Sequence, residues 1–124
     1  MLISNHIYYY LILLHFIADF ICQSNMSITA RGKDFWWLLV HIVAYTLTLF
    51  SGMMLGVLFM GFSAGMTFKF VSLLAVIHFF ADYILGKISS HLWETKRHRW
   101  AFVIMGAEQF IHIILLICIF QLIN

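Results

Sequence analysis

Residues 14–21 read LHFIADFI, and residues 77–84 read IHFFADYI. Each stretch places a histidine and an aspartate four positions apart within an otherwise apolar run. Because residues i and i+4 lie on one face of an α-helix, each stretch predicts a helix with an imidazole and a carboxylate on the same side. The similarity between the stretches indicates an internal repeat, here of two helical hairpins related by a pseudo-two-fold axis along a membrane normal.

The composition of the chain excludes a water-soluble monomer. Its 124 residues are 64% hydrophobic and 10% charged, and their mean hydropathy is +0.99. Globular domains are about 45–50% apolar and about 25% charged, and a small domain buries only about two-thirds of its unfolded surface. Disorder requires the opposite composition. The net charge of +2 is too small to indicate a nucleic-acid partner.

Four apolar runs are long enough for transmembrane helices, which need about 17–25 residues. The predicted spans are 7–23, 35–60, 68–85 and 100–122. The connections between them, which carry polar and small residues, are 24–34, 61–67 and 86–99. No connection is long enough to separate domains, so we expect a single domain over residues 1–124. The predicted fold class is an all-α, polytopic membrane protein.

Basic residues predict the orientation of the spans. Connections 24–34 and 86–99 hold six of the seven Lys and Arg residues, and the other side holds only Lys69. Since cytoplasmic loops are enriched in Lys and Arg, both basic connections are expected in the cytoplasm and both termini outside it. We therefore expect a multi-pass protein of the inner (cytoplasmic) membrane of a cell, with the lipid bilayer as its surroundings.

Ionisable residues inside the predicted spans are the most informative feature of the chain. Three of its five acids and four of its seven histidines lie there. A carboxylate at mid-membrane costs about 2.5–3.5 kcal/mol, which argues for a shared partner inside the bundle. Counting along the helices places all seven groups in one layer of the cytoplasmic half. These residues are His15, Asp19, His41, His78, Asp82, Glu108 and His112.

A divalent metal site is the leading interpretation of this layer, with one or two ions. Imidazole and carboxylate donors suit Zn²⁺, Mn²⁺ or Fe²⁺. The expected ligands are His15, Asp19, His78, Asp82, Glu108 and His112. His41 and Gln23 are expected as further ligands or as donors behind them. Two alternatives remain open: hydrogen bonds that only hold the bundle together, and a proton or cation path.

Several motifs resemble a known family of small bacterial and phage membrane proteins, domain-of-unknown-function family 3307. They are residues 15–23 (HFIADFICQ), Lys33, His41, His78-x-x-x-Asp82-Tyr and Gln109-x-x-His112. The resemblance covers nearly the whole chain and implies a four-helix membrane protein with a polar intramembrane site, in which Gln109 supports that site. The family's last motif would have an aspartate where this chain has Glu108. The His/Asp helices are also similar, in motif chemistry only, to membrane-bound metal-dependent hydrolases.

The leading function hypothesis is a metal-dependent hydrolase that acts on a lipid-linked or small amphiphilic substrate. A metal lowers the pKa of a bound water, and Glu108, if it is not a ligand, would be the general base. Lys33 and Arg31 are expected at the inner mouth, where they would bind a phosphate or carboxylate headgroup. The alternatives are a metal-ion or proton transport component and a non-catalytic phage or bacterial membrane partner. Whether the protein forms a homo-oligomer or joins a larger membrane complex is left open.

Overall fold

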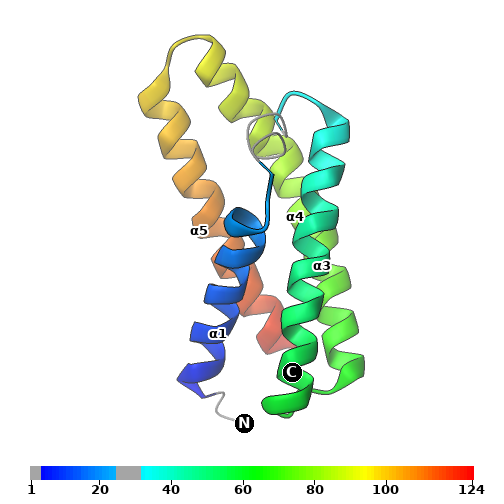
Figure 1. Ribbon diagram of the computed structural model, residues 1–124. Helices are drawn as coiled ribbons and strands as arrows, with labels where there is room; N and C mark the ends of the chain where they lie inside the picture. The colour runs from blue at the N-terminus through cyan, green and yellow to red at the C-terminus, as the bar shows by residue number, and fades with distance from the viewer. Residues whose placement is uncertain (1–3, 25–31) are drawn as a thin grey trace.

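The computed structural model describes residues 4–24 and 32–124, and the regular structure in this part is entirely helical. The helices enclose a common interior in an elongated bundle (Figure 1). In chain order the elements are α1 (Asn5–Phe16), the π-helix η1 (Ile17–Ile21), α3 (Phe35–Phe59), α4 (Ala64–Glu94) and α5 (His98–Ile123). The all-α prediction is therefore confirmed for the described residues.

Polar side chains begin two of the long helices. The Asp34 carboxylate accepts a hydrogen bond from the backbone N–H of Trp36 at 2.8 Å, which starts α3. The Ser63 hydroxyl accepts one from the N–H of Met66 at 3.0 Å, which starts α4. Such caps satisfy N–H groups that have no partner within the helix. Between α3 and α4 the chain reverses at Gly61, whose φ of 76° lies in the left-handed region that glycine tolerates.

The connection predicted at 86–99 is mostly helical, so this part of the prediction was wrong. α4 continues through Gly86 to Glu94, because one glycine without a proline weakens a helix but does not end it. The helix ends where Lys96 adopts a φ of 59°. There the N–H of Arg97 donates to the carbonyl of Leu92 at 2.8 Å, a bond that closes the last turn.

The long helices form two consecutive hairpins, and α1 packs against them (Figure 1). α4 makes its most extensive contacts with α5 and α3, whereas α1 touches α3 and α5 over fewer positions. Gly52 on α3 allows α1 to approach closely, because a Cβ at this position would overlap the side chain of Leu14. The Tyr10 hydroxyl donates to the Gly52 carbonyl at the same contact.

The interior has an apolar part and a polar part. The apolar part, nearer the chain termini, includes Leu11, Leu49, Phe70, Leu116 and Phe120. One to two helical turns toward the other end, the buried residues become polar. This polar layer, which we call the polar cluster, consists of His15, Asp19, His41, His78, Asp82, Glu108 and His112.

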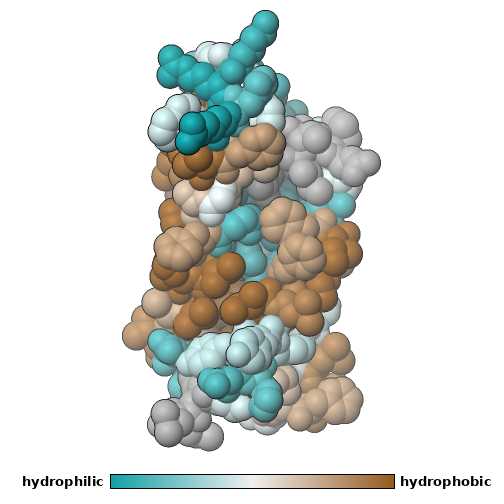
Figure 2. Space-filling model, turned by 90° about the vertical axis from the view of Figure 1, so that its left-hand side faces the viewer, coloured by the Kyte–Doolittle hydropathy of each residue, from teal (hydrophilic) through white to brown (hydrophobic). Residues whose placement is uncertain are grey.

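Three described helices are long and apolar enough to cross a membrane: α3, α4 and α5. Large apolar side chains such as Leu47, Phe68 and Phe110 are exposed on their outer faces. Figure 2 shows a band of apolar atoms on one face of the molecule, with hydrophilic atoms toward both ends. A membrane protein follows from this arrangement. α1 is shorter, with 12 residues continued by the five of η1, so the structure supports three of the four predicted spans directly.

Candidate metal site

The two repeated motifs meet at the centre of the polar cluster, together with a histidine from α3. His41 Nε2 lies 3.0 Å from Asp19 Oδ1 and 2.9 Å from Asp82 Oδ2. His78 Nε2 lies 3.5 Å and 3.2 Å from the same two oxygen atoms. The two Nε2 atoms are 3.4 Å apart. Three separate segments, η1, α3 and α4, therefore direct four ligand-type atoms toward one point.

The spacing of these four atoms matches the coordination shell of a small divalent cation. Ligands about 2.0–2.1 Å from a tetrahedral Zn²⁺ lie about 3.3–3.4 Å from one another. The five distances among Asp19, His41, His78 and Asp82 given above run from 2.9 to 3.5 Å. All four ligand atoms lie within 4.8 Å of one another, so the residues fit such an ion.

Hydrogen bonds alone explain these short distances less well than a shared cation does. Each Nε2 atom carries at most one proton when its ring is neutral. His41 and His78 therefore donate at most two hydrogen bonds among five close contacts, one of which joins nitrogen to nitrogen. A cation at the centre would contact all four atoms at once.

The burial of the acidic side chains is a second reason to expect a cation in the polar cluster. Within residues 4–24 and 32–124, the fully buried polar and charged residues include three acids and four histidines but no lysine or arginine. Asp19 and Asp82 are each only 1% exposed. Buried carboxylates are costly unless they are paired or bind a metal, and a divalent ion would offset two of the negative charges.

Two further groups of ligand atoms adjoin the first one and share its acids. His112 Nε2 lies 3.2 Å from Asp82 Oδ1, and its Nδ1 lies 4.0 Å from Asp19 Oδ2. Glu108 offers an oxygen within 4.8 Å of ligand atoms of Asp82 and His112, and His15 offers a ring nitrogen within 4.8 Å of ligand atoms of Asp19 and His112. All six residues expected as ligands thus belong to one continuous cluster, which His41 joins.

The π-helix η1 positions Asp19. The N–H of Cys22 donates to the carbonyl of Ile17 at 2.9 Å, the wider hydrogen-bond step of a π turn. Within this turn Ala18 and Asp19 are buried against the bundle. Gln23 holds the end of the turn: its amide donates to the carbonyls of Ala18 at 2.8 Å and His41 at 3.3 Å. The structure therefore gives Gln23 a main-chain bracing role and places its amide nitrogen on carbonyls.

His15 connects the cluster to two neighbouring side chains. Its Nδ1 lies 3.0 Å from the Tyr45 hydroxyl, and its Nε2 lies 3.1 Å from Gln109 Oε1. The amide nitrogen of Gln109 donates to Asp19 Oδ2 at 2.8 Å. With Gln109 oriented in this way, His15 donates from Nε2 and accepts from Tyr45 at Nδ1. The chain Tyr45–His15–Gln109–Asp19 therefore orients Asp19 from the side opposite His41.

Tyr45 is a site residue that the sequence analysis missed. Its ring stacks on His78 with centroids 4.0 Å apart, and His112 stacks on His78 at 4.2 Å. Tyr45 is fully buried. Its position four residues after His41 was the available signal, because that spacing places both side chains on one face of the helix.

Lys33, which was predicted at the inner mouth, lies outside the cluster. Lys33 pairs with Glu94 at 3.4 Å near the surface and has an exposed side chain. It also lines a small polar hollow of about 190 Å³ with Asp34, Tyr83 and Lys87. The prediction for Arg31 lies outside the described residues.

Comparison with known proteins identifies the family of the chain but no activity. No curated protein and no solved structure matches the chain. The model of one family, described as protein of unknown function (DUF3307), matches residues 7–124. The chain therefore belongs to the DUF3307 family.

Proposed function

We propose that the protein is an intramembrane metalloenzyme that binds one divalent ion, with Zn²⁺ the best fit, at Asp19, His41, His78 and Asp82. The single observation that carries this proposal is the convergence of four ligand atoms at 2.9–3.5 Å. His112 completes the surroundings from the side of Asp82. Mn²⁺ and Fe²⁺ use the same donor types and are the competing ions.

Hydrolysis is the reaction that this donor set supports best. A divalent ion held by these histidines and carboxylates would supply Lewis acidity, and an expansion of its shell to five ligands would admit a water for activation. Glu108 is buried beside Asp82 and His112, outside the four-residue group. A carboxylate in this position can take up a proton from the nucleophile, which is the role of a general base. We assign Glu108 this role, and a lipid-like substrate follows from the position of the cluster among apolar helices.

A transport role is less well supported by the arrangement. A conduit needs polar groups along its whole length, but the buried residues between the cluster and the terminal end are largely apolar. Leu11, Leu49, Met53, Leu116 and Phe120 fill this region and are nearly inaccessible. A cluster closed off by apolar residues on this side suits catalysis better than passage through the membrane.

The proposed placement in the membrane has four spans, with α1 and η1 as a short first span. The start of α3 and the α4–α5 turn lie at one end of the bundle, and both termini lie toward the other (Figure 1). The basic residues Lys87, Lys96 and Arg97 mark the first of these ends, which supports its cytoplasmic location. There Lys33, with Arg31, is proposed to hold an anionic headgroup, supported by the polar hollow beside Lys33 and Lys87.

Metal content tests the binding step. Protein purified in detergent, supplied with Zn²⁺, Mn²⁺ and Fe²⁺ and then desalted, should retain about one ion per chain. Asp82→Asn, which keeps the shape of the side chain, should lose that ion. Asp34→Asn is the matched control, because Asp34 is exposed at the start of α3 and asparagine also caps helices. Folded wild-type protein without metal would overturn the proposal.

Turnover of chromogenic substrates tests the reaction. We expect the metal-loaded protein to cleave p-nitrophenyl laurate or p-nitrophenyl dodecyl phosphate, and Glu108→Gln to abolish cleavage while it retains the ion. Loss of both the ion and the activity would instead make Glu108 a ligand. Absence of cleavage by the metal-loaded wild type would contradict the assignment to hydrolysis of chain-bearing esters.

A further inference from the structure

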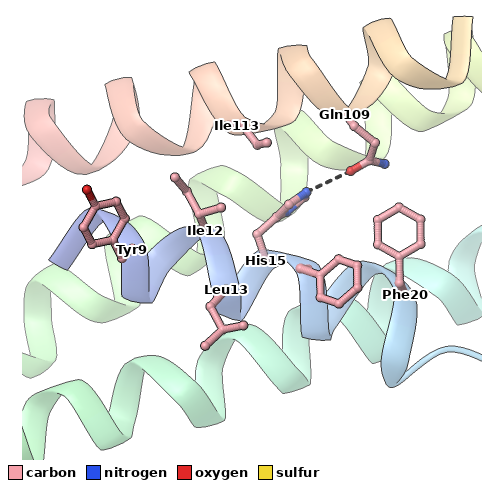
Figure 3. A pocket seen from close by; sticks show the side chains of 8 residues that line it. Tyr9, Ile12, Leu13, His15, Phe20, Gln109 and Ile113 are labelled. Atoms are coloured by element: carbon pink, nitrogen blue, oxygen red, sulfur yellow. Dashed lines mark hydrogen bonds between the residues drawn. The ribbon is translucent and has the colours of Figure 1, made fainter. Parts of the chain in front are cut away.

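A hollow on the outside of the bundle leads to the polar cluster. It has a volume of about 450 Å³ and lies between α1 with η1 on one side and α5 on the other. Ile12 and Ile113 form its walls, and His15 and Gln109 join across it by their hydrogen bond (Figure 3). Tyr9 lines one end and Phe20 the other. We call this hollow the α1–α5 groove.

The groove opens toward the bilayer. Leu13 and Phe16, which line it, are 57% and 49% exposed, as expected for side chains that face lipid. On the face of the molecule turned toward the viewer in Figure 2, hydrophilic atoms are visible in the middle of the apolar band. An apolar opening with polar groups inside it is unusual on a surface that faces lipid, because lipid offers such groups no hydrogen-bond partner.

Gln109 connects the groove to the proposed metal site. Gln109 hydrogen-bonds to His15 on the groove side and to Asp19 Oδ2 on the cluster side. Asp19 in turn contacts His41 at the proposed ion. A polar group that reaches His15 and Gln109 from the bilayer is thus one side chain away from Asp19.

We propose that the α1–α5 groove admits the hydrocarbon chain of a single-chain amphiphile laterally from the bilayer and places its polar linkage at His15 and Gln109. The proposal rests on the proposed function and names its substrate class: an alkyl or isoprenyl chain joined to an ester or phosphoester. The chain lies along Ile12 and Ile113. The linkage lies at His15 and Gln109, which with Tyr9 are the polar side chains among the described residues that line the groove.

The size of the groove favours this occupant. Its volume of about 450 Å³ falls within the roughly 300–1,000 Å³ of small-molecule pockets. The lining from Tyr9 to Phe20 extends about 16 Å at 1.5 Å per residue. A hollow of this volume and length suits one flexible chain.

Photocrosslinking in lipid nanodiscs tests the proposal. The probe is a dodecyl phosphate with a diazirine on its chain, and unlabelled dodecyl phosphate is the competitor. Labelling should concentrate at residues 9–20 and 109–113 and should be competed away. Ile12→Trp fills the groove and should lower the labelling roughly tenfold, which corresponds to about 1.4 kcal/mol of lost binding. Ile113→Trp fills it from the other wall and serves as a second variant if the first does not fold.

Val43→Trp is the matched control, because Val43 is 56% exposed on the outer face of α3, away from the groove. This variant should label as wild type does. Uniform labelling of all lipid-facing helices, without competition, would show only surrounding lipid and would overturn the groove proposal. Metal content is measured on the same samples. Loss of the ion with retained groove labelling would defeat the proposed function alone, and the converse would defeat the groove alone.

Discussion

His41 and His78, on neighbouring helices, point the same ring nitrogen at each other: their Nε2 atoms lie 3.4 Å apart. Their rings are stacked, with centroids 5.5 Å apart and an angle of 29° between the planes. Only one of these two nitrogen atoms can donate to the other, although both also face carboxylates. A shared cation would give both nitrogen atoms the same role, that of a ligand.

Removal of either histidine should abolish tight metal binding. His41→Gln or His78→Gln leaves three of the four proposed ligands. Mutation of a residue that only hydrogen-bonds to a metal ligand lowers metal affinity roughly 10–100-fold, so loss of a ligand itself should lower the affinity for Zn²⁺ by more than that. Competition titration with a fluorescent chelator in detergent measures this change. His91→Gln, at an exposed position on the same helix as His78, should bind as wild type does. Equal affinities for all three variants would contradict the assignment.

Metal should stabilise the folded bundle. An ion that binds only the folded state at 100 times its Kd adds about 2.7 kcal/mol to the free energy of unfolding. Thermal unfolding in detergent should therefore show a higher Tm with Zn²⁺ than with a chelator. Asp82→Asn should remove this difference between the two conditions, since its Tm would no longer depend on the metal. A metal-dependent Tm in that variant would place the ion elsewhere.

Tyr45→Phe should show that the Tyr45 hydroxyl orients His15 but does not bind the ion. It removes the hydroxyl at 3.0 Å from His15 Nδ1 and keeps the ring that stacks on His78. One buried nitrogen atom loses its partner, which costs about 1–3 kcal/mol of stability. The metal content should not change, because Tyr45 is not a proposed ligand. Tyr9→Phe, at an exposed position, is the control and should leave the Tm unchanged. Loss of the ion in Tyr45→Phe would make its hydroxyl part of the metal site.

Two glycine substitutions should have opposite effects on stability. A Cβ at Gly52 would overlap Leu14 of α1, so Gly52→Ala should destabilise the docking of α1 by about 1–3 kcal/mol. A Cβ at Gly106 on α5 meets nothing within 4 Å, so Gly106→Ala should stabilise its helix by about 0.5–1 kcal/mol. Chemical unfolding in mixed micelles measures both. Equal effects would mean that α1 does not pack on Gly52.

The helical fold and the membership of the polar cluster could be predicted from the sequence because both follow from spacing. A histidine and an acid four residues apart face one way on any helix, and their burial among apolar residues requires partners. The central position of His41 could not be predicted in this way, since it has no acid at that spacing on α3. Only the packing of α3 against η1 and α4 brings it between Asp19 and Asp82.

Two other features depend on tertiary structure or on weak local signals. The π turn at Ile17–Ile21 breaks the similarity between the repeats, because the equivalent residues 80–84 are α-helical. The pseudo-two-fold relation of the hairpins therefore stays a prediction. The extension of α4 to Glu94 was missed because Gly86 and the polar residues after it resemble a connection, although none of them prevents a helix.

X-ray absorption spectroscopy of the Zn²⁺-loaded protein tests the proposed metal site. We expect one Zn²⁺ per chain with four nitrogen and oxygen ligands at about 2.0–2.1 Å, including the outer-ring scattering of two imidazoles. Asp82→Asn, measured in parallel, should lack this spectrum. A shell of six oxygen atoms without imidazole scattering, or a sulfur ligand near 2.3 Å, would contradict a site built from Asp19, His41, His78 and Asp82.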